Sequence, residues 1–278
     1  MNTADPTLAA RFFFRNCAVS LHLPGEMRIS RSLKPSPDDI RLNRDFTPIE
    51  SPSEFIGPQS DFYTFINESS ESNASLIKKL CTIGYILCNK LDRNPAKHRS
   101  YGFICVNEEK GAYCNGKSLF AKALGLFCVC ERLSRKNLRN SFGLSGVTGA
   151  TQIVVIDGFD GNTSIRPFYT LCTSPWLIQR KTQPVLLIES AKSPHLILTS
   201  SASVAELPSD GSFRRRFVSL EFSSYWNESN RIEKYFGHAF FDEWSKEQWH
   251  MFDNFMFYCV LEYLRDYSNG NDVFSFYK

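Results

Sequence analysis

Residues 111–118 read Gly-Ala-Tyr-Cys-Asn-Gly-Lys-Ser, and their setting constrains the fold more than any other stretch of the chain. Residues 102–106, just before them, have the pattern of a short buried strand, and residues 118–130 have the pattern of a helix. A strand, a glycine-containing loop and a helix in this order are typical of a domain in which helices alternate with parallel strands.

The loop has the residues that phosphate binding requires. Phosphate binding needs glycines that let backbone N–H groups point inward, a lysine for the β- and γ-phosphates, and a hydroxyl group for magnesium. Gly111, Gly116, Lys117 and Ser118 meet this pattern in full. A chance loop is the alternative, but the flanking strand and helix favour a true phosphate loop. We therefore expect ATP and Mg²⁺ as ligands, with nucleotide contacts from Gly111, Ala112, Tyr113, Cys114, Asn115, Gly116, Lys117, Ser118 and Leu119.

A second chemical signal ends residues 152–157, a buried-strand pattern that finishes in Asp157. In P-loop ATPases an acid at this place holds magnesium, so we assign Mg²⁺ to Ser118 and Asp157. An ordinary strand that ends in an Asp-Gly turn is the alternative. The next residue is Gly158, where many such ATPases carry a second acid to activate water. Asp160 is the nearest replacement and our candidate catalytic base.

Two basic segments are candidates for charge recognition. Arg214, Arg215 and Arg216 precede a strand pattern at 217–222 and are candidates for an arginine finger that reaches a neighbouring subunit's nucleotide. An exposed basic turn is the alternative reading. Residues 177–188 suggest a β-hairpin with Arg180 and Lys181 at its tip. These two side chains either contact a nucleic-acid backbone or are merely solvated, and charge alone favours the second reading.

The remaining pattern predicts the domain organisation. Strands expected at 102–106, 152–157, 195–199 and 217–222 alternate with helices, which predicts an α/β fold with a parallel sheet. Residues 74–91 and 246–266 have helical spacing. Prolines interrupt the first 70 residues, where we expect short helices and loops. We therefore expect a mainly helical N-terminal region over residues 1–99 and a P-loop core with a C-terminal helix over residues 100–278.

Composition limits the other classes of protein to which this chain could belong. Hydrophobic residues make up 42% of the 278 and charged residues 22%, which is typical of a globular chain. No apolar run reaches the roughly 18 residues that cross a bilayer, and the first residues lack a signal-peptide pattern. The nine cysteines include no Cys-x-x-Cys pair, which favours reduced thiols and a cytoplasmic location. A net charge of +3 is too small to indicate a nucleic-acid partner without local clusters.

The order of these segments resembles a superfamily 3 helicase, the AAA+ type found in viral and mobile-element primase-helicases. The resemblance covers residues 74–266 and rests on residues 80–87, the P-loop, and residues 151–157, 192–201, 211–216 and 236–244. It implies an AAA+-like P-loop core that couples ATP hydrolysis to translocation along single-stranded DNA during replication. It also implies a ring-shaped homo-oligomer with its active site between subunits, a separate primase as a partner, and a bacterial, phage or mobile-element setting.

Two departures from that family concern water activation. Gly158 stands where the family has a second acid, and Ser201 stands where its sensor strand has an asparagine that positions the attacking water. The resemblance therefore supports ATP binding better than fast hydrolysis. A hydrolysis-attenuated relative that serves as a nucleotide- and DNA-binding assembly module is the alternative function. A P-loop kinase is a third, although the chain shows no lid-like arginine set.

Overall fold

The computed structural model describes residues 7–36, 39–49, 60–88, 101–110, 114–134, 142–159, 165–270 and 274. Two compact units form, which we call unit 1 (Met1–Asp92 with Ser229–Tyr277) and unit 2 (Arg93–Glu228 with Lys278). Residues 229–277 group with the N-terminal residues in unit 1. The expected domain boundary between residues 99 and 100 stays a prediction.

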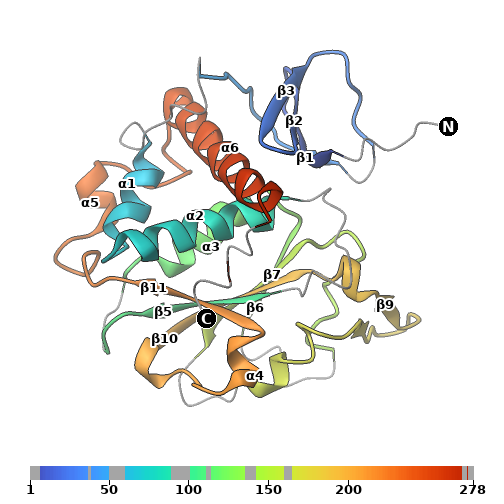
Figure 1. Ribbon diagram of the computed structural model, residues 1–278, viewed down its shortest axis with the longest axis vertical. Helices are drawn as coiled ribbons and strands as arrows, with labels where there is room; N and C mark the ends of the chain where they lie inside the picture. Colours follow the sequence, from blue (N-terminus) through green and yellow to red (C-terminus); the bar gives the residue numbers. More distant parts are fainter. Residues whose placement is uncertain are drawn as a thin grey trace. The chain divides into compact units, whose positions relative to one another are not determined.

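Unit 2 is built on a five-stranded sheet (Figure 1). Its strands are β5 (Gly102–Asn107), β6 (Cys130–Ser134), β7 (Ile153–Phe159), β10 (His195–Ser203) and β11 (Phe217–Phe222). They lie in the order β11-β5-β10-β7-β6, and every neighbouring pair is parallel. The predicted α/β class with a parallel sheet is therefore confirmed.

Apolar packing on both faces explains why these segments form strands. All six residues of β5 are buried, as a strand covered on both sides requires. Ile104 and Val106 belong to a core cluster that also takes in Trp176 and Phe213. Helix α3 (Lys117–Gly125) packs against β10 and β7, and its Phe120 ring meets Phe222 edge-on at 5.8 Å.

The helix after the P-loop is shorter than predicted. We expected it to continue to residue 130, whereas α3 ends at Gly125 and residues from Cys130 form strand β6. Backbone bonds from Leu126 N to Ala123 O and from Phe127 N to Leu124 O close the helix. The edge strand β6 pairs only with β7, so it lacks the fully apolar run that marks a central strand.

Short elements connect the long strands of unit 2. Strands β8 (Trp176–Ile178) and β9 (Leu186–Ile188) pair antiparallel, which confirms the predicted hairpin. The described residues of this unit also form 3-10 turns at η3 (Arg166–Phe168), η4 (Ser190–Lys192) and η5 (Val204–Glu206). The four-residue helix α4 (Gly211–Arg214) leads into β11.

The N-terminal part of unit 1 is a β-sheet, so the prediction of a mainly helical region is wrong. Strands β1 (Leu8–Phe13), β2 (Ala18–His22), β3 (Glu26–Ser30) and β4 (Ile40–Arg41) lie in the order β3-β2-β1-β4. The Pro24-Gly25 pair between β2 and β3 is a turn signal that indicates a hairpin. Gly25 has φ +144°, and a Cβ there would lie 2.8 Å from Arg265 Cγ.

The other described elements of unit 1 are helices (Figure 1), and their sequences are rich in aromatic residues. Its helices are α1 (Asp61–Glu68), α2 (Asn73–Leu87), α5 (Ile232–Phe236) and α6 (Lys246–Ser268). The predicted helices at 74–91 and 246–266 correspond to α2 and α6. Ser245 and Gln248 form a reciprocal cap at the start of α6. Aromatic rings from α1, α6 and the segment before α6 pack together. The ring centroids of Phe62 and Phe252 are 5.1 Å apart, and those of Phe241 and Trp244 are 4.6 Å apart.

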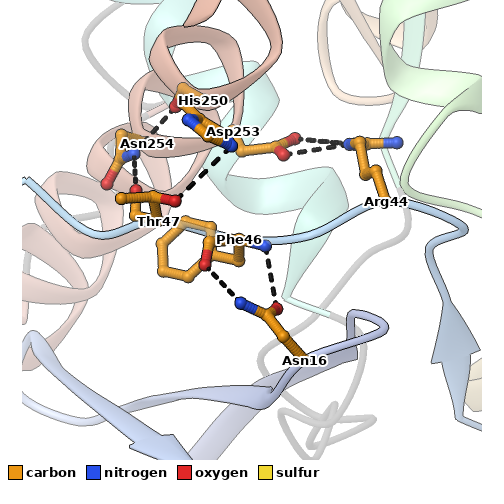
Figure 2. A network of polar contacts seen from close by, with 7 residues as sticks. All are labelled: Asn16, Arg44, Phe46, Thr47, His250, Asp253 and Asn254. Atoms are coloured by element: carbon orange, nitrogen blue, oxygen red, sulfur yellow. Dashed lines mark hydrogen bonds and ion pairs between the residues drawn. The ribbon is translucent and has the colours of Figure 1, made fainter. Parts of the chain in front are cut away.

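A polar network joins residues 44–49 to α6 (Figure 2). Arg44 donates three hydrogen bonds, two through Nε and one through Nη2, to the carboxylate of Asp253, the shortest at 2.6 Å, and its guanidinium lies 4.5 Å from the centroid of the Trp249 ring. The Asp253 side chain is fully buried, so loss of Arg44 would leave an uncompensated buried charge. Asn16 holds both the N–H and the carbonyl of Phe46, each at 2.9 Å.

In the described part of the chain, no helix combines the length and hydropathy that crossing a bilayer requires. None of the nine cysteines is in a disulfide, and Cys114 alone among them is exposed.

Replacing Gly84 with alanine should destabilise unit 1. A Cβ at Gly84 would lie 2.4 Å from the Cys259 carbonyl oxygen and 2.5 Å from Tyr263 Cβ, so α2 and α6 would have to separate. Overpacking of this kind typically costs about 1–3 kcal/mol. Chemical denaturation measures the change.

The matched control is Gly149→Ala, because a Cβ at Gly149 meets nothing within 4 Å. We expect its free energy of unfolding to stay within about 0.5 kcal/mol of the parent value. Equal effects of the two substitutions would contradict the close approach of α2 to α6.

Candidate functional site

Polar residues gather at the carboxyl ends of three neighbouring strands in unit 2. Asn107 ends β5, Asp157 lies near the end of β7, and Thr199 lies in β10 between those two strands. Ligands of open α/β sheets bind outside the carboxyl ends of the strands. The P-loop also leaves β5 at this edge, so the predicted nucleotide site and the observed polar cluster coincide.

Lys117, the first residue of α3, has two amide partners. Its Nζ donates to Asn107 Oδ1 and, at 2.5 Å, to Asn115 Oδ1. Burial lowers the pKa of Lys117 from its ordinary value of 10.5 to about 8. The amine is therefore held by neutral oxygens in a partly desolvated site, where an additional, anionic partner would stabilise its charge strongly.

Asn107 pins the end of the loop to the sheet. It is fully buried, its Nδ2 donates to the Ser201 carbonyl at 2.9 Å, and its Oδ1 accepts from Asn115 Nδ2 at 2.9 Å. Sequence reasoning missed Asn107 as a site residue. The available signal was a buried-strand pattern that ends in an amide.

The loop backbone turns sharply before the helix. Cys114 has φ +59° and Gly116 has φ +85°, in the left-handed region that glycine adopts without strain. Gly116 thereby starts α3 at Lys117, and Leu119 lies in its first turn. Gly111, Ala112 and Tyr113, predicted to contact nucleotide, lie outside the described residues.

Asp157 has three side-chain partners. Its Oδ1 accepts from Thr199 Oγ1 at 2.9 Å and from Ser118 Oγ at 3.4 Å, and its Oδ2 accepts from Arg132 Nη1 at 3.3 Å. The structure thus brings together Ser118 and Asp157, the two predicted magnesium residues. Thr199 and Arg132 were missed, because only the order of the strands in the sheet makes them neighbours of Asp157.

A β-bulge follows Asp157. Leu198 of β10 pairs with Ile156, whereas Ser200 pairs with Phe159, so β7 carries one extra residue at this point. Gly158 has φ +73°, and its N–H donates to Thr199 Oγ1 at 3.3 Å. The position at which many P-loop ATPases carry a second acid is therefore a bulge with left-handed backbone.

Two further residues, Ser201 and Asp160, are predicted to act on water. Ser201, the predicted sensor, is exposed, and its carbonyl oxygen accepts from Asn107. Asp160, the predicted base, lies outside the described residues. Their roles stay predictions.

The three arginines lie at the amino-terminal ends of the strands, opposite the ends where the P-loop leaves the sheet. Arg216 directly precedes β11, and its carbonyl accepts from Gly102 N at the start of β5. Arg214 and Arg215 are exposed, whereas Arg216 donates to Ser212 O and lies 5.2 Å from the Tyr169 ring. Strand β5 is six residues long, so about 20 Å separates this end of the strands from the end at which the P-loop leaves β5.

The two basic residues of the hairpin tip differ. Arg180 is half-buried and donates to the Val147 carbonyl at 2.9 Å, which is a structural contact. Lys181 is exposed, 5.9 Å from the Phe142 ring. An open concavity of about 590 Å³ lies beside both, lined also by Ser145, Thr148 and Gln183.

The sequence matches no protein-family model and no curated protein. Among solved structures, this one is similar to an A-form apo structure of the NrS-1 C-terminal region, with TM-score 0.49, 13% identity, 94% of this chain covered and 69% of that chain. A second A-form apo structure of that region gives TM-score 0.44, 12% identity and 90% and 65% coverage. JCV helicase bound to a small molecule gives TM-score 0.35, 15% identity and 74% and 60% coverage. At these values the likeness by itself assigns no activity, so the function rests on the residues of the site.

Replacing Thr199 with valine should destabilise unit 2. Valine keeps the shape of threonine but removes the hydroxyl group that donates to Asp157 and accepts from Gly158 N. Loss of a hydrogen bond to a charged group costs about 1.5–3 kcal/mol, and the partial exposure of Asp157 places the expected cost at the lower end. Denaturant unfolding followed by tryptophan fluorescence suits this test, because Trp176 and Trp226 are buried in unit 2.

Thr173→Val is the control, since Thr173 is exposed and its hydroxyl donates only to Tyr169 O. A loss at Thr199 no larger than the loss at Thr173 would show that this hydroxyl does not hold the bulge.

Proposed function

We propose that unit 2 binds MgATP at the loop between β5 and α3. We further propose that it couples hydrolysis to movement along single-stranded DNA, as a helicase core of the superfamily 3 type. The observation that carries the proposal is the placement of Lys117, Ser118 and Asp157. These are the lysine, hydroxyl and carboxylate that phosphate and magnesium need, at the carboxyl edge of one parallel sheet.

The fit to a triphosphate rests on α3 and on Lys117. The start of a nine-residue helix carries unpaired N–H groups and partial positive charge, both of which attract phosphate. Lys117 would exchange its two amide partners for phosphate oxygens. Because burial has already lowered its pKa, its pairing with an anion regains charge stabilisation that it lacks in the present contacts.

The fit to Mg²⁺ rests on Ser118 and Asp157. Their oxygens lie 3.4 Å apart, and Mg²⁺ prefers oxygen ligands, usually one or two carboxylates with phosphates and waters. Bound Mg²⁺ would supply charge neutralisation on the phosphates. Thr199 would hold the carboxylate in orientation, and Arg132 would have to yield its contact with Asp157.

The arginines would act between subunits. Residues 214–216 lie at the amino-terminal ends of the strands, whereas the P-loop of the same chain lies at the carboxyl ends. A role as arginine finger therefore requires a nucleotide bound to another copy. A homo-oligomeric ring places such ends against each other. Arg214 and Arg215, which are exposed, are better candidates than Arg216, whose guanidinium is engaged within unit 2.

For the DNA contact we favour Lys181 over Arg180. Lys181 is exposed beside the Phe142 ring and the open concavity, an arrangement that suits a backbone phosphate next to a stacked base. Arg180 would support the tip through Val147.

The second candidate function is a nucleotide- and DNA-binding assembly module with little turnover. The bulge at Gly158 favours it, because the second-acid position has neither a side chain nor ordinary strand geometry. The Arg132 contact favours it too, since it neutralises Asp157.

Lys117→Ala should abolish or severely weaken ATP binding, measured by calorimetry with a non-hydrolysable ATP analogue and Mg²⁺. The parent should also show a pH dependence. Phosphate raises the pKa of Lys117 in the complex, so affinity should hold constant below about pH 8 and then fall by up to tenfold per pH unit above it.

Lys110→Ala is the matched control, because Lys110 is 84% exposed and precedes the loop. It should keep the parent affinity and pH profile. Unchanged affinity in Lys117→Ala would refute the phosphate loop, and a flat profile between pH 7.5 and pH 9.5 would refute the buried lysine.

The assembly-module function predicts slow hydrolysis, below about 1 per second with or without single-stranded DNA, whereas the helicase function predicts a faster rate that DNA stimulates. Gly158→Asp should raise the rate, because it adds a carboxylate beside the magnesium residues, and aspartate tolerates left-handed backbone better than most residues. A Cβ at Gly158 meets nothing within 4 Å, so there is space for the side chain. A steady-state phosphate-release assay measures both rates.

Gly158→Asn separates charge from shape, since asparagine adopts the same backbone without a carboxylate. It should leave the rate unchanged. A parent rate of several per second, stimulated by DNA, would instead favour the plain helicase over the assembly module.

A further inference from the structure

Three arginines of unit 1 converge on one end of its small sheet. In the strand register, Phe13 at the end of β1 pairs with Ala18 and with Arg41, and Ala18 pairs with Ser30 at the end of β3. Arg15 in the β1–β2 turn, Arg31 just after β3 and Arg41 at the end of β4 therefore share this end. Because the strands lie in the order β3-β2-β1-β4 and about 4.8 Å apart, the charges spread over about 14 Å.

These arginines are poorly neutralised by the protein. All three are exposed. Among the described residues, Arg15 pairs with Asp45 at 3.3 Å with both side chains more than half exposed, and neither Arg31 nor Arg41 forms an ion pair. Residues 7–49 contain seven Lys and Arg against four Asp and Glu, an excess equal to the net charge of the whole chain.

A concavity lies at the same end. It has a volume of about 370 Å³, and its lining includes the three arginines together with Asn16, Leu33 and Asn43. The volume is within the range of about 300–1,000 Å³ that ligand pockets occupy. We call this feature the arginine groove.

The protein holds the walls of the groove in place. Asn16 bonds both the N–H and the carbonyl of Phe46, and Arg15 N donates to Arg44 O at 3.0 Å (Figure 2 shows the Asn16–Phe46 bonds). Arg44 is in turn tied to the buried Asp253 of α6. A binding surface that is rigid before binding loses little conformational entropy on binding.

We propose that the arginine groove binds the phosphodiester backbone of single-stranded nucleic acid, as a second contact separate from the hairpin tip of unit 2. Guanidinium groups match phosphate oxygens in bidentate geometry. Charges spread over about 14 Å suit a polyanion better than one phosphate ion. The choice of nucleic acid over an acidic peptide rests on the proposed function.

The lining of the groove also predicts how it would bind a nucleic-acid strand. Phe13 and Phe14 line it but are 6% exposed each, so they offer no face on which a base could stack. Affinity must then come from contacts with the phosphodiester backbone of the nucleic acid. Binding should therefore be insensitive to the nucleotide sequence and steeply dependent on salt.

The test measures binding of a fluorescent single-stranded oligonucleotide by anisotropy from 50 to 500 mM salt, without nucleotide. In the full chain, the double variant Arg31→Gln/Arg41→Gln should bind roughly tenfold or more weakly at 50 mM salt. Its salt slope should fall by about 1.4, because each lost phosphate contact on a single strand removes about 0.7. Melting temperatures establish that each variant is folded.

The single variants Arg31→Gln and Arg41→Gln are measured as well, and Arg28→Gln is the matched control for each of them. It removes the same charge from the same sheet, but Arg28 pairs with Glu26 outside the groove. Its affinity should stay within twofold of the parent. If the groove variants bind like the parent at every salt concentration, or no more weakly than Arg28→Gln, the groove is not a nucleic-acid site.

Three further arms complete the design. Tighter binding of a duplex of the same sequence would overturn the single-strand assignment, and stronger competition by polyglutamate than by an unlabelled oligonucleotide would overturn nucleic acid as the ligand. Lys117→Ala should keep the groove-dependent binding in this nucleotide-free assay. A failure of the ATP-site proposal therefore leaves the contrast between groove and control variants readable.

Discussion

The hydroxyl group of Thr199 connects the parts on which the candidate site depends. It donates to the Asp157 carboxylate and accepts from the Gly158 N–H, so it orients the acid and closes the bulge that follows. It can do so because β10 lies between β5 and β7. The same strand supplies the carbonyl of Ser201 that fixes Asn107, and through Asn107 it anchors the end of the P-loop. One central strand thus sets the geometry of both halves of the site.

The charged side chains at the carboxyl ends of these strands each have partners within the protein. Lys117 is satisfied by two amides and Asp157 by a threonine, a serine and an arginine. Each of these partners is weaker for its charge than a phosphate or a divalent cation would be. A ligand that offers both would exchange several modest contacts for stronger ones, which is the physical basis for proposing MgATP rather than a neutral ligand.

Both units present basic groups whose geometry limits what they can do. The arginines before β11 lie too far from the P-loop of their own sheet, so any role with ATP requires a second copy. The arginine groove in unit 1 has guanidinium groups without an aromatic platform, whereas Lys181 in unit 2 lies beside the Phe142 ring. In the proposed nucleic-acid contacts, the first arrangement would recognise charge alone, and the second could also hold a base.

The sequence by itself determined the features that depend on residues close together in the chain. The strand–loop–helix around the P-loop, the β8–β9 hairpin and helix α6 were all readable, because a buried run, a turn and a helical period are local patterns. Tertiary structure decided what depends on pairing. The strands at residues 8–41 were missed because they are short and gain stability only from one another. Thr199, Arg132 and Asn107 became site residues only when the strand order brought distant segments to one sheet edge, and no spacing in the sequence encodes that order.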